Sequence, residues 1–189
     1  MDRPVSNFHF RVMALNLKLR DILFPPKNIL EEAEIKPGFH VLDYGCGPGS
    51  YVSAASELVG KSGKIYALDI NPAAIKTVKT VISKNQLTNV ETILSDHMTG
   101  LSDSSVNVVL LYDIFHGLSE PDEVLKELHR VLKPDGILSF SDHHMKEKEI
   151  ISRVTKRELF KLIGKGKRTY SFSKELISKI QSRENSLQV

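Results

Sequence analysis

The first chemical signal in the chain is a glycine-rich stretch, Asp43-Tyr-Gly45-Cys-Gly47-Pro-Gly49, which follows a short apolar run and precedes a helical pattern. Glycines allow a tight turn and let the backbone pass close beneath a ligand. The N-terminus of the following helix favours an anionic group such as a carboxylate. A glycine-rich loop alone is a weak signal, so its meaning depends on the residues that accompany it.

Two further carboxylates follow the next apolar runs. Asp69 ends the run at 64–69, where an acidic side chain can hold both hydroxyls of a ribose. Asp96 follows the run at 90–94, where it can accept a hydrogen bond from an adenine amino group. With Asp43, carboxylates therefore stand at the ends of three successive predicted strands, and this combination favours a nucleoside-containing ligand.

Candidates for proton transfer follow the next two predicted strands. Phe115 and His116 come after residues 106–112, close to Asp113, and Asp142, His143 and His144 come after residues 136–141. Histidine is suited to proton transfer near neutral pH, so His116 and His143 are the candidate catalytic residues, with a structural role equally open for both. A structural role is favoured for His144. The ligand types would also suit a metal, but nothing in the spacing fixes a geometry, so no metal is predicted.

The elements that must position these residues alternate between strands and helices. Parallel strands joined by helical crossovers bind ligands at the carboxyl ends of the strands. We therefore predict an α/β fold, Rossmann-like and doubly wound, with a mostly parallel seven-stranded sheet and an antiparallel C-terminal hairpin strand around Gly164-Lys-Gly166. The expected strands are 40–43, 64–69, 90–94, 106–112, 136–141, 160–163 and 168–172, and the main crossover helices are 50–59, 71–82 and 124–132, the last opened by a capping box at Ser119–Asp122 and stopped by Pro134.

An amphipathic helix is expected ahead of this domain. Phe8, Val12, Leu15, Leu19, Ile22 and Leu23 recur at helical spacing before Pro25-Pro26, and this apolar face needs a surface to lie on. We expect the helix to lie over the mouth of the ligand site; the alternative is that it merely covers sheet surface. The predicted organisation is a cap helix at 1–26, a ligand-binding domain at 27–173 and a helical or disordered tail at 174–189.

Composition limits the class of protein. The chain has 189 residues, a formal net charge of +3 and a single cysteine, which excludes an internal disulfide framework and a cysteine-rich zinc or iron–sulfur site. The absence of a long apolar run or a secretory signal predicts a cytoplasmic protein without a membrane span. Basic residues concentrate in 146–189, which suggests either a surface for nucleic acid or another anionic partner, or simply a solvated edge of the fold.

The glycine spacing separates two cofactor classes. Dinucleotide-binding loops carry Gly-x-Gly-x-x-Gly, whereas this chain has Gly-x-Gly-x-Gly with Asp43 two residues ahead, so nicotinamide-dependent oxidoreduction is disfavoured. The pattern resembles motif I of the class I S-adenosylmethionine-dependent methyltransferases. The resemblance extends over roughly 27–173, through Ile65–Asp69, Leu101–Val109 and Leu125–Gly136, and is nearest to the ubiquinone/menaquinone-biosynthesis (methyltransferase type 11) small-molecule branch.

The resemblance implies a cofactor site residue by residue. The methionine part of S-adenosyl-L-methionine would be bordered by Asp43, Tyr44, Gly45, Cys46 and Gly47; Asp69 would hold the ribose, Ile70 would pack on the adenine, and Asp96 and His97 would meet its rim. Two positions depart from the family pattern. Asn107 replaces the usual Asp, which we interpret as structural, and His97 replaces a small residue, so we expect the adenine rim to be shaped differently in this chain.

The resulting hypothesis is methyl transfer from S-adenosyl-L-methionine to a small-molecule acceptor by in-line displacement. Two alternatives remain open: a methyltransferase for RNA or protein that uses the basic C-terminal region, and a cofactor-binding module without catalysis. The familiar Asn-Pro-Pro-aromatic and Pro-Cys motifs of nucleic-acid methylation are absent from the sequence, which favours the small acceptor.

Overall fold

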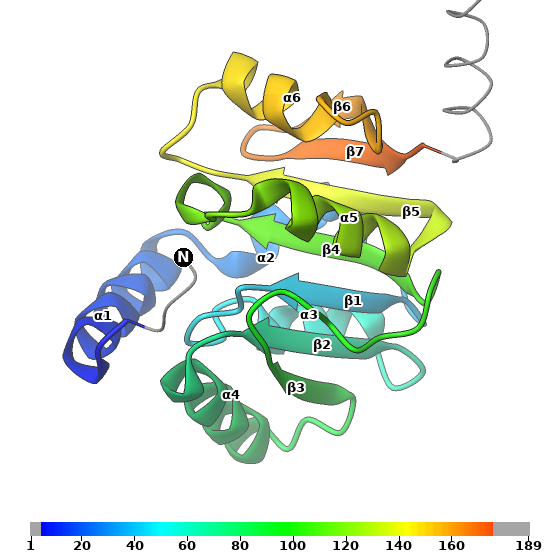
Figure 1. Ribbon diagram of the computed structural model, residues 1–189. Helices are drawn as coiled ribbons and strands as arrows, with labels where there is room; N and C mark the ends of the chain where they lie inside the picture. The colour runs from blue at the N-terminus through cyan, green and yellow to red at the C-terminus, as the bar shows by residue number, and fades with distance from the viewer. Residues whose placement is uncertain (1–4, 176–189) are drawn as a thin grey trace, which may run out of the picture.

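The computed structural model describes residues 5–175, and its centre is a seven-stranded sheet in the order β3-β2-β1-β4-β5-β7-β6 (Figure 1). The first five strands run parallel, and β7 is antiparallel to both of its neighbours. The predicted fold class is therefore confirmed. The strands are β1 (His40–Tyr44), β2 (Lys64–Asp69), β3 (Val90–Leu94), β4 (Val106–Tyr112), β5 (Leu132–Ser141), β6 (Phe160–Lys165) and β7 (Tyr170–Lys174).

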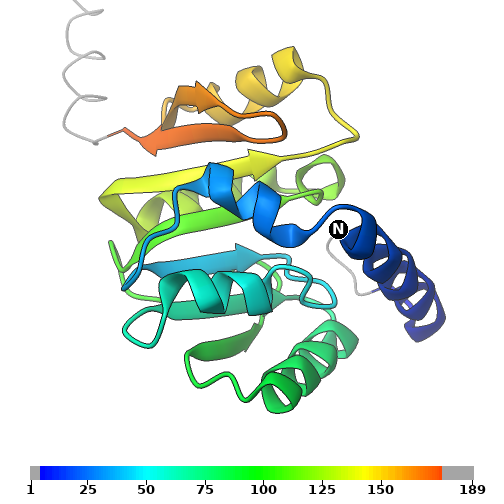
Figure 2. The same ribbon diagram turned by 180° about the vertical axis from the view of Figure 1, so that it is seen from behind.

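Helices cover both faces of this sheet. The short α2 (Pro26–Leu30), η1 (Glu31–Ala33) and α3 (Val52–Val59) lie on one face (Figure 2), with α4 (Pro72–Asn85) beside α3. The other face carries α5 (Pro121–Val131) and α6 (Glu147–Thr155), and the turn η2 (Phe115–Gly117) follows β4. Because β4 is covered from both sides, its side chains are buried apart from the half-buried Asn107, as the continuous apolar run predicts.

The start of β5 differs from the prediction. The expected strand began at Gly136 and followed a helix at 124–132, but α5 ends at Val131 and β5 begins at Leu132. Proline disfavours helical backbone in the residue before it, so the helix cannot run up to Pro134. The intervening residues form a bulge: Val106 pairs with Leu132, and the next pair along β4 is Val108 with Ile137.

Two local turn predictions were also wrong. The first helical residue of α5 is Pro121 and its N-cap is Glu120, so the helix begins one residue later than a capping box at Ser119–Asp122 requires. The hairpin turn lies after Lys165, with Gly164 inside β6 opposite Ser171. A distant residue decides the turn: the carboxylate of Glu32 accepts hydrogen bonds from the backbone N–H groups of 168 and 169 and from the hydroxyl of 169.

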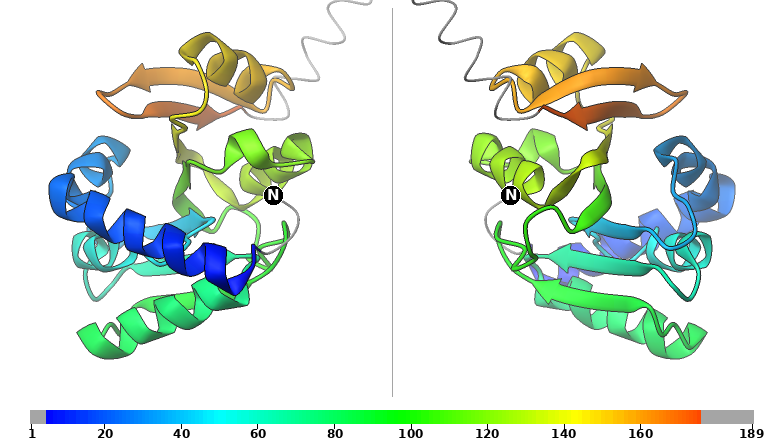
Figure 3. Two further views of the ribbon diagram at one scale, coloured as in Figure 1. Left: turned by 90° about the vertical axis from the view of Figure 1, so that its left-hand side faces the viewer. Right: turned by 90° about the vertical axis from the view of Figure 1, so that its right-hand side faces the viewer.

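The N-terminal helix α1 (Asn7–Leu23) forms as predicted but presents the opposite face. Its predicted apolar face points to solvent; among these side chains Phe8 and Leu23 are each 73% exposed and Leu15 is 60% exposed. The expectation that this face is covered by the protein is therefore wrong, and the buried aromatic is Phe10. The helix crosses in front of the strands when the molecule is viewed toward their carboxyl ends (Figure 3, left).

Two further predictions concern the ends of the chain. No helix among residues 5–175 is long and apolar enough to cross a membrane. Most of the predicted tail at 174–189 lies outside the described residues, so its helical or disordered character stays a prediction.

Candidate cofactor and acceptor site

The glycine-rich loop is tied to the neighbouring strand by its backbone. The N–H groups of Gly45 and Cys46 donate to the carbonyl of Leu68 in β2 at 2.8 and 2.9 Å. Gly45 has a positive φ of 81°, and a Cβ there would meet the end of the Ile114 side chain at 2.7 Å, so glycine is favoured by the backbone and by the space. Gly47 also has a positive φ, but a Cβ there would meet nothing within 4 Å. The loop therefore presents open space at Gly47, next to its own backbone.

Asp69 holds this loop from the end of β2. Its Oδ2 accepts a hydrogen bond from the N–H of Gly47 at 2.9 Å, and its Oδ1 accepts one from the N–H of Asn71 at 2.8 Å. Burial raises the pKa of Asp69, and these backbone hydrogen bonds oppose the rise. Each carboxylate oxygen can accept a second hydrogen bond, so Asp69 still has acceptor capacity for the hydroxyls predicted from the sequence.

Asp43 is a buried carboxylate of the site with one oxygen that lacks a hydrogen-bond partner. It is only 3% exposed, and its Oδ2 has no hydrogen-bond partner, the one such buried side-chain oxygen or nitrogen in the described part of the chain. Burial, together with the nearby charge of Asp69, raises the pKa of Asp43 to about 7. Buried polar groups without partners are rare and signal a missing donor. A ligand carrying an ammonium group would provide one, which fits the methionine end of S-adenosylmethionine.

Tyr44 and Cys46 line the base of the loop as buried packing residues. The hydroxyl of Tyr44 donates to the carbonyl of His97 at 3.4 Å, which joins the end of β1 to the loop after β3. Burial, with added repulsion from Asp43 and Asp69, raises the pKa of the Cys46 thiol well above its usual range. The thiol therefore stays protonated and is no nucleophile.

The predicted adenine rim lies at the surface. The side chains of Asp96 and His97 are 64% and 45% exposed, and the N–H of His97 donates to Oδ1 of Asp96 at 2.9 Å. Ile70, directly after Asp69, is half-buried. The predicted cofactor residues thus surround the carboxyl ends of β1, β2 and β3, and their individual contacts with a cofactor stay predictions.

The first candidate catalytic residue, His116, is held by a buried carboxylate. Its Nδ1 lies 3.0 and 2.9 Å from the two oxygens of Asp142, and its backbone N–H also donates to that carboxylate. Burial would raise the pKa of Asp142, but hydrogen bonds from His116 and His144 outweigh it and hold that pKa below its ordinary value. Asp142 is therefore ionised, and this geometry assigns the proton of the neutral ring to Nδ1 and the lone pair to Nε2.

The second candidate, His143, forms an equivalent pair nearer the surface. Its Nδ1 lies 2.7 Å from Oδ1 of Asp113, whose other oxygen lies 3.8 Å from the guanidinium of Arg20. The ring of His144 lies close to both candidates, with centroid distances of 3.9 Å to His143 and 4.3 Å to His116. In the described residues, no three His, Cys, Asp or Glu side chains have an arrangement that could hold a metal ion.

Arg20 and Tyr51 are site residues that sequence reasoning missed. Arg20, on α1, reaches both Asp113 and the ring of Tyr51, whose centroid lies 5.8 Å from the guanidinium carbon. No local sequence signal could find this contact, because α1 is far from both partners along the chain. Asn107, the departure from the family pattern, accepts hydrogen bonds from the N–H of His40 and from Lys133, which fits the structural role predicted for it.

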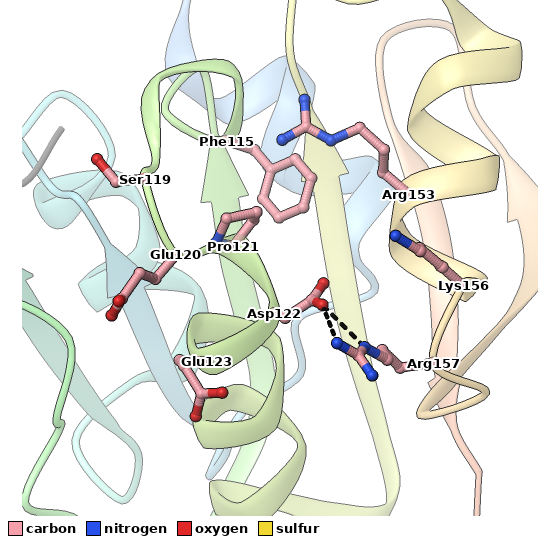
Figure 4. Close-up of a pocket in the computed structure, with 9 residues that line it drawn as sticks. All are labelled: Phe115, Ser119, Glu120, Pro121, Asp122, Glu123, Arg153, Lys156 and Arg157. Carbon is pink, nitrogen blue, oxygen red and sulfur yellow. Dashed lines mark hydrogen bonds and ion pairs between the residues drawn. The ribbon is translucent and has the colours of Figure 1, made fainter.

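A separate pocket of about 390 Å³ lies between the start of α5 and α6 (Figure 4). Its lining contains none of the predicted cofactor or catalytic residues, although Phe115 is the neighbour of His116. Arg157 is paired with Asp122 across it, and the guanidinium of Arg153 lies 4.8 Å from the centroid of the Phe115 ring. The charged lining is thus partly neutralised within the protein.

The comparison with known protein families gives the same kind of domain as the glycine loop, Asp69 and the sheet order indicate. The profile of a methyltransferase domain family matches residues 35–185. The chain belongs to this methyltransferase domain family. It is a class I domain of the kind that depends on S-adenosylmethionine, and the predicted family and cofactor are confirmed.

Individual relatives are more distant. A demethylmenaquinone methyltransferase of Geobacillus stearothermophilus is 30% identical over 68% of this chain and 56% of its own length. An arsenite methyltransferase of Halobacterium salinarum is 34% identical over 58% of this chain but only 28% of its own length. This methyltransferase domain thus spans roughly half or less of these curated relatives.

A solved structure matches nearly end to end. A SAM-dependent methyltransferase from Aquifex aeolicus superimposes with a TM-score of 0.72 at 27% identity, covering 85% of this chain and 97% of that one.

Proposed function

We propose that this methyltransferase domain transfers a methyl group from S-adenosylmethionine to a small-molecule acceptor that loses a proton in the reaction. The observation that carries the proposal is the pairing of His116 with the buried Asp142 at the carboxyl ends of the central strands. A methyl transfer to a hydroxyl, an amine or an acidic carbon needs a base to accept that proton. An imidazole held in one tautomer by an ionised carboxylate is such a base.

The cofactor end of the site is assigned to the first three strands. Asp43 would accept from the ammonium group of the cofactor, Asp69 from its ribose hydroxyls, and Gly47 leaves the space that the cofactor needs. When bound, S-adenosylmethionine supplies an electrophilic methyl group on a sulfonium sulfur. The protein then has to align the acceptor and exclude water, because the leaving group needs no further activation.

Neighbouring side chains support His116 as the base. Asp142 accepts the Nδ1 proton of His116, which leaves Nε2 free to take a proton from the acceptor. When His116 becomes an imidazolium, the adjacent carboxylate stabilises its charge. His143 and Asp113 repeat this arrangement in a more exposed position and would pass the proton on toward solvent.

The surface around the site favours a small acceptor. Several basic side chains of the region 146–175 are engaged within the protein: Arg157 pairs with Asp122, Lys165 with Glu147, and Arg153 with Glu149. These pairs reduce the basic surface available to RNA. The names of the relatives include acceptors as different as demethylmenaquinone and arsenite. A single buried cysteine offers no set of thiolates for arsenic, so an organic acceptor is favoured.

The test combines cofactor binding with acceptor turnover. Calorimetry should show binding of S-adenosylhomocysteine, and a panel of phenols, quinols, amines and acidic carbon compounds should include one that yields S-adenosylhomocysteine from S-adenosylmethionine. The variant His116→Gln should bind S-adenosylhomocysteine as the wild type does but lose most turnover. Unchanged turnover in that variant would contradict the role of His116 as the base. Methylation of RNA in preference to every compound of the panel would contradict the proposal of a small-molecule acceptor.

A further inference from the structure

The exposed apolar face of α1 is a surface that the methyl-transfer site does not use. Six of its side chains repeat at intervals of three, four and one residues along one side of the helix and are 46–73% exposed: Phe8, Val12, Leu15, Leu19, Ile22 and Leu23. At 3.6 residues per turn they form a continuous stripe along the length of the helix. A contiguous apolar surface of this kind marks an interaction site.

The protein holds this stripe outward. On the opposite side of α1, Phe10 is buried and Leu17 is half-buried, and the helix packs against α4. The start of the helix is tied to the domain by Asn71, whose amide donates to the carbonyl of Val5 at 3.3 Å. Its last turns are held by Arg20 beside Asp113. The helix therefore cannot turn its stripe inward without losing Phe10 from the core and both contacts.

The exposed charges of α1 are basic. Arg11 and Lys18 are exposed and lie along one border of the stripe, each three residues after one apolar side chain and four before the next. Asp21 is the only acidic residue of the helix, and it is largely buried and held by Arg20 at 2.8 Å. An apolar stripe bordered by basic side chains is complementary to a surface that is apolar inside and negatively charged at its border.

We propose that α1 binds the surface of an anionic phospholipid bilayer, with the helix lying in the plane of the interface. Its apolar side chains would enter the boundary between headgroups and acyl chains, and Arg11 and Lys18 would reach the phosphates. Pairing with a second copy lacks this complementarity. If two α1 helices packed antiparallel through the stripe, Arg11 and Lys18 would face the same two basic residues of the second copy. If the helices packed parallel, Arg11 and Lys18 would face Asn16 and Leu23 of the second copy.

The position of α1 connects this surface to the methyl-transfer site. The helix crosses the carboxyl ends of the strands (Figure 3), and Arg20 joins it to Asp113 beside the candidate base. On the bilayer, the site would face a supply of amphiphilic acceptors. This consequence rests on the proposed function, whereas membrane binding itself does not, so the two are tested separately.

The direct test is flotation of the full chain with vesicles of phosphatidylcholine alone and of phosphatidylcholine mixed with phosphatidylglycerol. We expect flotation with the mixed vesicles, little with the neutral ones, and a decrease as salt is raised. The double variant Leu15→Asp/Leu19→Asp should lose binding to both. The double variant Arg11→Gln/Lys18→Gln should weaken binding to the mixed vesicles by about fivefold for each charge removed.

Matched controls lie elsewhere on the surface. Ile163→Asp removes an exposed apolar side chain of β6, and Lys79→Gln removes an exposed charge of α4; neither should change flotation. Binding of S-adenosylhomocysteine and the circular dichroism spectrum should be retained in every variant, which separates loss of the surface from loss of the fold. Failure of the wild type to float, or flotation that the α1 variants leave unchanged, would overturn the proposal. The proposal would also be overturned if sedimentation showed a dimer of the wild type and a monomer of Leu15→Asp/Leu19→Asp, because the stripe would then bind a second copy.

Discussion

Nδ1 of His116 lies 2.9 Å from Oδ2 of Asp142, so a histidine that follows β4 is held by a carboxylate that follows β5. The neighbouring pair has the reverse arrangement: His143 follows β5 and is held by Asp113, which follows β4. The two pairs thus cross between adjacent parallel strands. Because β4 and β5 end side by side, each carboxylate lies within reach of the other strand's imidazole.

The buried pair should contribute more to catalysis than the exposed one. Asp142→Asn removes the carboxylate charge that fixes the Nδ1 proton of His116 and stabilises its imidazolium, so kcat for the methyl acceptor should fall by roughly 10²–10⁴, the usual contribution of a general base. Asp113→Asn is the matched variant and should lower kcat much less, because the side chain of His143 is 67% exposed. Steady-state kinetics with the acceptor, beside the dissociation constant for S-adenosylhomocysteine, measures both. Equal losses in the two variants would contradict the assignment of His116 as the base.

The pKa of Asp43 makes stability and cofactor binding depend on pH in opposite directions. Burial raises its folded-state pKa to about 7 from an ordinary value of 3.8, so the folded chain binds a proton that the unfolded chain has lost. The free energy of unfolding of the cofactor-free chain should therefore fall as pH rises from about 4 to about 7. Binding of the ammonium-bearing S-adenosylhomocysteine favours the ionised carboxylate, so affinity should rise over the same range.

Asp43→Asn checks both effects. The variant should lose this pH-dependent part of its stability and should bind S-adenosylhomocysteine more weakly at pH 8 than the wild type. Thermal unfolding across pH and calorimetry in buffers of different ionisation enthalpy measure the two, because the wild type should release a proton on binding near neutral pH. Binding without proton release would mean that Asp43 does not meet the ammonium group.

A second buried carboxylate supplies stability that the fold loses at low pH. Glu127 is 5% exposed and accepts hydrogen bonds from Arg130 and from the N–H and hydroxyl of Thr99. Burial would raise its pKa, but these hydrogen bonds and the charge of Arg130 lower it to about 2. The stability it supplies is present above its ordinary pKa of 4.5 and is lost as pH falls from there to about 2.

Glu127→Ala should lower the free energy of unfolding at pH 7 by about 3 kcal/mol, at the low end for a broken buried pair because Arg130 is a third exposed. Chemical denaturation at pH 7 and pH 3 measures the difference, which should shrink at the lower pH. Glu123→Ala removes an exposed partner of Lys126 on the same helix and should change stability little. A difference that does not shrink would place the effect in packing and not in charge.

Substitutions at two glycines of the loop should distinguish an effect on folding from an effect on cofactor binding. Gly45→Ala drives a Cβ against Ile114 and should destabilise the domain strongly. Gly47→Ala meets no neighbour within 4 Å, so its effect on folding should be limited to the positive φ, roughly 1–2 kcal/mol. It places a methyl group where the cofactor is proposed to lie, and affinity for S-adenosylhomocysteine should fall. Thermal unfolding and calorimetry on the two variants measure stability and affinity. Normal affinity in Gly47→Ala would mean that the cofactor does not lie against the loop.

The sequence predicted best where local patterns and burial agree. The strands expected at 64–69, 90–94 and 106–112 depend on neighbours in sequence, and they occur with those bounds. The start of β5 lies at a bulge in its pairing with β4, the hairpin turn is held by the distant Glu32, and both were placed wrongly. Helical spacing correctly predicted α1, but spacing alone does not say which side of a helix the rest of the protein covers.

The sequence by itself determined the sheet, the loop and the carboxylates that end the first three strands, because strand–helix alternation and glycine spacing are local and specific. Only the tertiary structure decided which side chains meet. The crossed histidine–carboxylate pairs, the reach of Arg20 to Asp113 and the missing partner of Asp43 arise from chain segments brought together across the sheet. Distances and burial of that kind come from packing, which no spacing along one chain segment encodes.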